Sequence, residues 1–167
     1  MDIIKKEDGI IYLKGDATEP LIFNDKYSVI CHCCNALGAW GRGFVVPLGE
    51  KYPKAKEKYS DFIKTTNRNE RLGRVSFAKV TSKIIVANII GQFYIYSNKY
   101  NPTPLDYDAL EKGFNTVIEN FNKHNMPLTI HMPLIGCGLA KGNWDIVKKI
   151  IKKTFINKEI EVYVYLL

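Results

Sequence analysis

Stretches rich in isoleucine, valine and tyrosine alternate along the chain with stretches in which apolar residues recur every three or four positions. This alternation is typical of an α/β domain, in which buried strands form a sheet and amphipathic helices cover both of its faces. We expect strands at residues 10–13, 29–32, 75–80, 83–90, 128–132 and 162–166. We expect helices at residues 43–52, running on through 54–64, and at residues 106–124 and 144–154.

The length of the chain fits a single domain. Its 167 residues, 46% of them hydrophobic, can bury one core and are too few to divide into two, so we expect one domain over residues 1–167. The sequence holds no run of about 18 apolar residues, so we expect no membrane partner. The first residues, MDIIKKED, are charged and lack the apolar segment of a secretory signal. We therefore expect a cytoplasmic location, where thiols stay reduced.

The net charge of +7, from 24 basic and 17 acidic residues, permits an anionic partner but identifies none. Part of the excess lies at or near the last expected helix, in Lys148, Lys149, Lys152, Lys153 and Lys158. The apolar residues expected to face inward from the same segment are Ile146, Val147, Ile150, Ile151 and Phe155. We interpret the lysines as the solvated face of an amphipathic helix, because no motif of a nucleic-acid-binding module accompanies them.

Unusual loops follow four of the expected strands. They are Lys-Gly-Asp at 14–16, a glycine-rich stretch at 35–43, Gly-Gln at 91–92 and Ile-Gly-Cys-Gly at 135–138. In open α/β sheets, ligands bind in the crevice beyond the carboxyl ends of the strands. We therefore expect these loops to converge on one site.

Residues 31–34, Cys-His-Cys-Cys, contain two residue types that bind zinc. Structural zinc sites pair ligands across a short spacer, whereas these residues are consecutive, and consecutive side chains of a strand point to opposite faces. No second pair of ligands follows. We expect no metal, and we interpret the cysteines as small core residues at the end of a strand. A redox pair between this stretch and Cys137 stays open, while no base can be named for a cysteine nucleophile.

Two glycine-rich loops have the features of a phosphate site. Glycines at 38, 41 and 43 permit close approach of the backbone to a ligand, ahead of an expected helix. The stretch Gly-Cys-Gly-Leu at 136–139 repeats the pattern, and Asn143 can cap the helix that follows. Neither the Walker motif nor the dinucleotide fingerprint is present, so purely structural turns stay an alternative.

Two further residues have alternative interpretations. The carboxylate of Asp16 could accept a hydrogen bond from an exocyclic amine such as that of adenine, or it could close a turn on its own backbone. Trp40, between glycines, could stack on a planar ligand or fill the edge of the core.

Five segments in order resemble a macrodomain. They are KGDAT at 14–18, HCCNALGAWGRGF at 32–44, VANIIGQ at 86–92, MPLIGCGL at 132–139 and VYVY at 162–165. The loop GAWGRG, followed by YPKAKEKY at 52–59, is similar to the branch that includes the fungal ADP-ribose 1″-phosphate phosphatase, the terminal ADP-ribose protein glycohydrolase and the macrodomain of a chromatin remodeller. The resemblance implies a three-layer α/β/α fold with a central mixed sheet, and ADP-ribose or an ADP-ribosylated macromolecule as partner, without a cofactor. It implies a nucleic-acid partner only as an ADP-ribosylated target.

The resemblance also implies roles for particular residues. Asp16, helped by the backbone of Ala17, would receive the adenine amine. The distal ribose and the diphosphate would lie against main-chain groups of residues 41–43 on one side. The second glycine loop, residues 136–139, would close the other side. The implied ligand-binding residues are Asp16, Ala17, Asn35, Trp40, Gly41, Arg42, Gly43, Gln92, Gly136, Cys137, Gly138 and Leu139.

Two positions depart from the glycohydrolase branch. That branch has a lysine nucleophile after the VAN-type strand and an aspartate after the second glycine loop, where this chain has Gln92 and Ala140. Because neither side chain can do that chemistry, we expect the mechanism to be absent. We expect a module that binds ADP-ribose without turnover. The alternative is a hydrolase of ADP-ribose 1″-phosphate or another ADP-ribose adduct, in which His32, Asn35 or an acidic neighbour assists a water positioned by bound phosphates.

Overall fold

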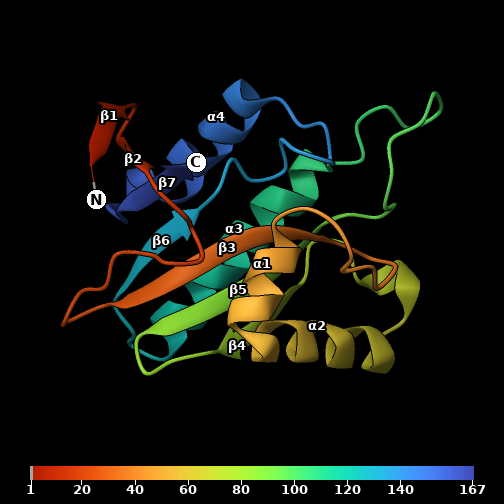
Figure 1. Ribbon diagram of the computed structural model, residues 1–167, viewed down its shortest axis with the longest axis horizontal. Helices are drawn as coiled ribbons and strands as arrows, with labels where there is room; N and C mark the ends of the chain where they lie inside the picture. The colour runs from red at the N-terminus through yellow and green to blue at the C-terminus, as the bar shows by residue number, and fades with distance from the viewer. Residues whose placement is uncertain (1) are drawn as a thin grey trace.

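The computed structural model describes residues 2–167, which form one mixed sheet between two layers of helices (Figure 1). The strand order is β1-β2-β7-β6-β3-β5-β4. The strands are β1 (Ile3–Glu7), β2 (Ile10–Lys14), β3 (Tyr27–Asn35), β4 (Val75–Lys79), β5 (Ile84–Gln92), β6 (Leu128–Met132) and β7 (Val162–Leu166). The five inner strands are parallel and the edge strands β1 and β4 are antiparallel to their neighbours. The predicted three-layer fold is confirmed.

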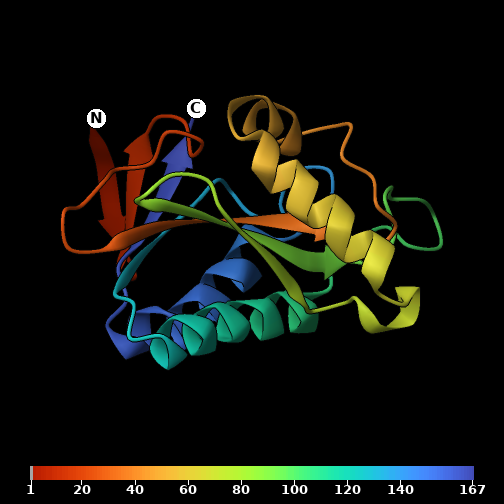
Figure 2. The same cartoon turned by 90° about the horizontal axis from the view of Figure 1, so that it is seen from below.

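Helices cover both faces of the sheet (Figure 2). One layer holds α1 (Val45–Lys51) and α2 (Pro53–Thr65), and the other holds α3 (Tyr107–Lys123) and α4 (Trp144–Thr154). Short 3-10 turns lie at η1 (Arg68–Glu70) and η2 (Ile156–Lys158). Within residues 2–167, none of the helices combines the length and the apolar character that crossing a membrane requires.

Alternation along β3 divides its side chains between the two helical layers. Cys31 is buried in the cluster that contains Phe114 of α3, and Cys34 is buried in the cluster that contains Leu48 of α1. Ile30, next to Cys31, lies in the same cluster as Cys34, so successive strand residues pack into different cores, as the period of two predicts. The prediction that the first part of the cysteine-rich stretch is a buried strand is confirmed.

The predicted elements differ from the observed ones in several places. Strand β1 was not predicted, because all five of its residues are exposed and no buried face marks them. The expected continuous helix is two helices, since Tyr52 has φ −128° and ψ 81° before Pro53. The first of them begins at Val45 and not at residue 43. Strands β3 and β5 also run further than predicted, to Asn35 and Gln92.

Helix α4 has the expected amphipathic character. It buries Val147, Ile150 and Ile151 against the sheet, while Ile146, expected inside, is 41% exposed. Lys148 contacts Glu7 at 3.0 Å and Asp8 at 3.4 Å. These contacts tie α4 to the β1–β2 hairpin, so part of the basic face has a structural partner.

Candidate functional site

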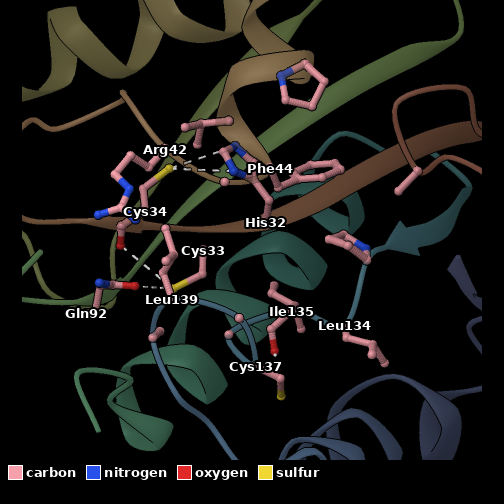
Figure 3. A pocket seen from close by; sticks show the side chains of 18 of the residues that line it. His32, Cys33, Cys34, Arg42, Phe44, Gln92, Leu134, Ile135, Cys137 and Leu139 are labelled. Atoms are coloured by element: carbon pink, nitrogen blue, oxygen red, sulfur yellow. Dashed lines mark hydrogen bonds between the residues drawn. The ribbon is translucent and has the colours of Figure 1, made fainter. Parts of the chain in front are cut away.

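A cavity of about 1230 Å³ lies at the carboxyl ends of the parallel strands (Figure 3). All four predicted loops contribute to its wall, because the parallel strands bring their carboxyl ends to the same edge of the sheet. The lining segments include residues 15–17, 41–45, 95–96 and 133–141. The predicted residues that line the cavity are Asp16, Ala17, Asn35, Gly41, Arg42, Gly43, Gln92, Gly136, Cys137, Gly138 and Leu139.

Asp16 stands at one end of the cavity, in a turn that its own side chain closes. Its Oδ1 accepts hydrogen bonds from the backbone N–H and the hydroxyl of Thr18, both at 2.8 Å. Among residues 2–167, its Oδ2 has no hydrogen-bond partner. The predicted turn-closing role is therefore confirmed, and a second oxygen stays available to a ligand in the cavity.

The end of helix α1 and the residue that follows it support the turn that contains Asp16. The hydroxyl of Tyr52 donates to the carbonyl oxygen of Thr18 at 2.8 Å. Lys51 forms an ion pair with Glu19 at 2.8 Å. The helix that follows the first glycine loop is thus linked to the turn that carries Asp16.

Tyr165 of β7 also lines the Asp16 end of the cavity and belongs to a buried polar chain. Its hydroxyl accepts from the backbone N–H of Leu21 at 2.9 Å and lies 2.7 Å from His131 Nδ1. The other ring nitrogen of His131 lies 2.7 Å from the hydroxyl of Thr129. Burial lowers the pKa of His131 to about 3, so the ring is neutral at pH 7.

Asn35 shapes the first glycine loop. Its Oδ1 accepts from the backbone N–H groups of Leu37 and Ala39, both at 3.0 Å, and its Nδ2 donates to the Ala39 carbonyl oxygen at 2.9 Å. The Tyr59 hydroxyl donates to the Asn35 carbonyl oxygen at 2.6 Å. Because these bonds engage both ends of the amide, Asn35 holds the loop and is not free to act on a water.

A buried arginine supports the same loop from behind. Arg71 is 9% exposed, and its guanidinium donates to the carbonyl oxygens of Ala36, Ile63 and Thr66 at 2.6 to 2.8 Å. Its Nε donates to the Thr66 hydroxyl at 3.0 Å. The cation joins the end of α2 to the loop, where it also faces the negative end of the helix dipole.

Trp40 points into the core. It is 9% exposed, and its ring centroid lies 5.4 Å from that of Tyr59 and 5.6 Å from that of His32. Its side chain is not part of the cavity wall. The structure thus corrects the expectation that Trp40 contacts a ligand, because its place among the aromatic residues beneath the loop is the core-filling alternative.

His32 lines the cavity but is held in place beneath it. Its Nε2 is hydrogen-bonded to Asn88 Oδ1, and Asn88 Nδ2 donates to the Ala55 carbonyl oxygen at 3.0 Å. Burial lowers the pKa of His32 to about 4, against the smaller opposing effect of the Asn88 bond. At pH 7 the ring is therefore neutral, with one nitrogen already bonded.

The four cysteines are free thiols. Burial raises the pKa of Cys33 to about 12 and that of Cys137 to about 11, and it also raises those of Cys31 and Cys34. The protonated thiol is a poor nucleophile. No disulfide joins Cys137 to the 31–34 stretch, and the redox pair stays a prediction. Figure 3 shows Cys33 and Cys137 among the residues that line the cavity. In the part of the chain that the structure describes, no group of three or more histidines, cysteines and acids is placed to hold a metal.

The second glycine loop closes the opposite side of the cavity. Gly136 has φ +71° and its carbonyl oxygen accepts from Gly142 N at 2.8 Å. Asn143 caps α4 by accepting from Asp145 N at 2.8 Å, which confirms the predicted cap. A Cβ built on Gly43 would lie 3.3 Å from Leu139 Cδ1, so the two glycine loops approach each other.

Gln92 and Ala140 lie near each other at the end of the cavity away from Asp16. Gln92 is 8% exposed, and its Nε2 donates to the Tyr94 carbonyl oxygen at 2.8 Å. Ala140 is 4% exposed, and its carbonyl oxygen accepts from Leu105 N at 3.2 Å. Leu105 in turn forms a bridge with Gln92, which brings the two positions together.

Several residues of the site were not predicted. Ile95, Tyr96, Phe44, Leu134 and Tyr165 line the cavity. Arg71, Tyr52 and Tyr59 support its loops from outside. Phe44, Leu134 and Tyr165 lie inside the segments that carry the resemblance, and Tyr96 stands in the tyrosine-rich segment after β5, but nothing in the sequence assigned any of them to the site.

Comparison with known proteins gives a consistent set of relatives. No family model matches the chain. A Bacteroides thetaiotaomicron protein of unknown function is 42% identical, with a TM-score of 0.85 over 95% of this chain and 98% of that one. A macrodomain protein from Streptomyces coelicolor is 31% identical, with a TM-score of 0.76 over 93% of this chain and 97% of that one. The ADP-ribose 1″-phosphate phosphatase of Candida albicans is 25% identical over 93% of this chain and 99% of its own length.

Proposed function

Since the chain belongs to the macrodomain family, we propose that its cavity binds ADP-ribose, either free or as the terminal ADP-ribose of a modified macromolecule. The observation that carries the proposal is the arrangement of three recognition elements along one cavity. A carboxylate stands at one end, two glycine loops face each other across the middle, and a neutral amide stands at the far end. No cofactor is needed for such binding.

The adenine belongs at the Asp16 end. Oδ2 of Asp16 can accept a hydrogen bond from the exocyclic amine, while Oδ1 keeps the turn closed. Phe44 and Tyr165 supply apolar ring surface at the same end of the cavity. A purine with an oxygen in place of the amine would meet the carboxylate with an acceptor, so the site distinguishes adenine from guanine and hypoxanthine.

The diphosphate belongs between the glycine loops. Gly41 and Gly138 line the cavity and have no atom within 4 Å of the position a Cβ would take, so a ligand can approach the backbone closely at both. Backbone N–H groups in such loops, with the adjoining helix behind them, favour bound phosphate. In this arrangement the Cys137 loop acts through its main chain, in keeping with a protonated thiol.

We propose binding without the glycohydrolase mechanism that uses a lysine and an aspartate. Gln92 is fixed by the Tyr94 carbonyl and cannot form an amine adduct. Ala140 has no proton to transfer, and His32 is neutral and bonded to Asn88. Asp145, the nearby acid in the sequence, lies in the first turn of α4, where its backbone N–H donates to the Asn143 cap, and it is exposed.

A hydrolase of ADP-ribose 1″-phosphate is the second candidate. It is favoured by the full-length similarity to the Candida albicans enzyme of that name. In this candidate the bound phosphates and the loop N–H groups position a water molecule.

Calorimetry with ADP-ribose tests the shared premise. We expect saturable binding with one site per chain, and an absence of binding at millimolar ligand would overturn both candidates. Phosphate release from ADP-ribose 1″-phosphate then separates them. A rate no higher than that of the Asp16→Ala variant under the same conditions means binding alone, and a rate well above it means the phosphatase.

A further inference from the structure

We infer that a groove beside the cavity, between β5 and α3, binds a basic segment of the polypeptide that carries the bound ADP-ribose. The wall of this β5–α3 groove includes Phe93, Tyr94, Tyr100, Asp106 and Asp108, and its volume is about 640 Å³. The inference rests on the proposed function, because it gives a place to the macromolecule whose terminal ADP-ribose occupies the cavity. It adds a second ligand class, the ammonium and guanidinium groups of lysine and arginine.

The groove adjoins the Gln92 end of the cavity. Leu105 lines the groove and forms a bridge with Gln92, and a Cβ on Gly136 would lie 2.7 Å from Leu105 Cδ2. Figure 2 shows the segment between β5 and α3, in green, projecting beyond the ends of β3 and β5. With adenine at Asp16, the distal ribose lies at the Gln92 end, so a chain attached to that ribose leaves the cavity next to the groove.

One segment supplies side chains to both sites. Ile95 and Tyr96 line the cavity, while Tyr94 and Tyr100 line the groove. The segment that holds them, residues 93–104, contains no helix or strand. Segments of this length without secondary structure of their own are commonly functional. A ligand in the cavity and a chain in the groove therefore contact the same short stretch of the protein.

The charge of the groove is opposite in sign to that of the chain. Among the residues that the structure describes, the charged ones on the groove wall are Asp106 and Asp108, and neither has an ion-pair partner there. Oδ1 of Asp106 caps α3 by accepting from Ala109 N at 2.9 Å. In a chain of net charge +7, such a groove attracts cations that the rest of the surface repels.

Exposed aromatic rings form another part of the wall. Tyr94 is 54% exposed and Tyr100 is 86% exposed. The face of such a ring attracts an ammonium or guanidinium group. Lys99 of the chain itself makes this contact, since its Nζ lies 4.9 Å from the centre of the Tyr100 ring. Within residues 2–167 no cation lies over the ring of Tyr94, so this ring is available to a partner.

A lysine or arginine side chain fits both parts of this wall. Its charged group can donate hydrogen bonds to a carboxylate, while its apolar stem covers aromatic surface. A nucleic-acid strand would instead bring its phosphates to the same two carboxylates, so the charge of the groove favours a basic peptide. Because the peptide is joined to the bound ADP-ribose, even a weak contact in the groove adds to the affinity of the whole ligand.

The test is calorimetry on the full chain with ADP-ribose and with three ADP-ribosylated peptides. The peptides share one hydrolysis-resistant linkage to C1″ and carry lysine, norleucine or glutamate on both sides of the modified residue. We expect the lysine peptide to bind about fivefold or more tightly than the norleucine peptide, the combined scale of an exposed ion pair and a cation over a ring. General attraction to a chain of net charge +7 predicts the opposite order, with the glutamate peptide tightest.

Variants assign the preference to the groove. Asp106→Asn and Asp108→Asn should each lower the ratio of the norleucine-peptide to the lysine-peptide dissociation constant and leave the affinity for free ADP-ribose unchanged. Asparagine in place of Asp106 can still cap α3, so the fold is kept. Asp145→Asn is the matched control, because Asp145 lies in the first turn of α4 and outside the walls of the cavity and the groove. Tyr94→Leu should lower the ratio, and Tyr94→Phe should keep most of it because the ring remains.

Three outcomes would overturn the inference. They are a lysine peptide that binds no more tightly than the norleucine peptide, an equal loss of the preference in Asp145→Asn, and tighter binding of a single-stranded oligonucleotide ADP-ribosylated through the same linkage. The last would mean that the attached macromolecule is a nucleic acid. In each of these cases free ADP-ribose still binds, so the proposed function survives. Failure of free ADP-ribose to bind would instead overturn the proposed function.

Discussion

The hydroxyl of Tyr52 donates a hydrogen bond of 2.8 Å to the carbonyl oxygen of Thr18, across 34 residues of sequence. Thr18 in turn donates twice to Asp16. The junction between α1 and α2 thereby sets the position of the carboxylate that we assign to adenine. Several side chains outside the cavity act on its shape in this way, and each gives a measurable consequence.

Replacement of Asp16 by alanine should weaken ADP-ribose binding by about 1 to 3 kcal/mol, the scale of a hydrogen bond to a charged group. Asp16→Asn is the matched control for the turn, because the amide oxygen of asparagine can still accept hydrogen bonds from Thr18. Its NH₂ group, however, is a donor and cannot accept a hydrogen bond from the adenine amine. Calorimetry should show both variants weakened. Binding at the wild-type level in Asp16→Asn would remove the carboxylate from adenine recognition.

Tyr52→Phe should lower the affinity for ADP-ribose about threefold to tenfold, since loss of one hydrogen bond loosens the Asp16 turn. Tyr163→Phe removes a hydroxyl of the same kind, bonded to Glu161 at 2.5 Å and absent from the cavity wall. Calorimetry on both variants should show the loss only in the first. Equal affinities would mean that the turn keeps its shape unaided.

Gly43→Val should reduce both binding and stability. Gly43 has φ +82°, and a Cβ there would lie 3.3 Å from Leu139. A Cβ at Gly41 would have no atom within 4 Å, and Gly41 does not have a positive φ. The Gly41→Val variant should therefore fold normally and lose binding because the valine side chain occupies part of the cavity. Thermal unfolding followed by calorimetry separates the two effects. Normal binding by both variants would show that this loop does not contact the ligand.

Arg71→Met should lower the free energy of unfolding by about 3 kcal/mol or more, because it leaves several buried carbonyl oxygens without a donor. Arg71→Lys should recover little of the stability lost in Arg71→Met, because one ammonium group cannot reach acceptors in both the loop and the end of the helix. Arg68→Met is the control, since Arg68 is exposed three positions away. Urea unfolding measures all three, and similar losses at both positions would contradict the role given to Arg71.

Stability should fall as the pH drops below about 6.5. Burial lowers the pKa values of His32 and His131 from 6.5 to about 4 and about 3. Between those values and 6.5 the unfolded chain binds protons that the folded chain does not, so protonation favours unfolding. We expect a loss of about 1 to 2 kcal/mol per histidine between pH 6.5 and 5, and a level profile between pH 7 and 8.

Urea unfolding at intervals from pH 8 to 5 measures this profile. His124→Gln is the control, because His124 is exposed and its removal should leave the slope unchanged. An unfolding free energy that stays constant down to pH 5 would show that the buried rings do not resist protonation.

The sequence predicted best what depends on local pattern. Buried strands such as β3 and β6 stood out as apolar runs, and their parallel pairing places the glycine loops that follow them at one edge. It did not predict β1, whose exposed residues carry no such pattern. The residue pattern left Trp40 between the core and the ligand, and the resemblance assigned it to the ligand; its place in the core was missed because its partner Tyr59 belongs to another element.

The contacts that support the cavity could not be predicted from the sequence for a different reason. Arg71 bonds to Ala36 across 35 residues, and no local spacing marks that pair. Arg42 and Tyr96 meet only because β3 and β5 are neighbours in the sheet although β4 lies between them in sequence. Such pairs follow from topology, and the residue types alone do not specify them.

The approach of Leu139 to Gly43 has a kinetic consequence. The leucine is 44% exposed and lies where the two loops face each other. In the proposed complex a ligand that reaches from Asp16 to Gln92 would lie against this side chain. We therefore expect Leu139 to influence how fast the ligand enters and leaves as well as how tightly it binds.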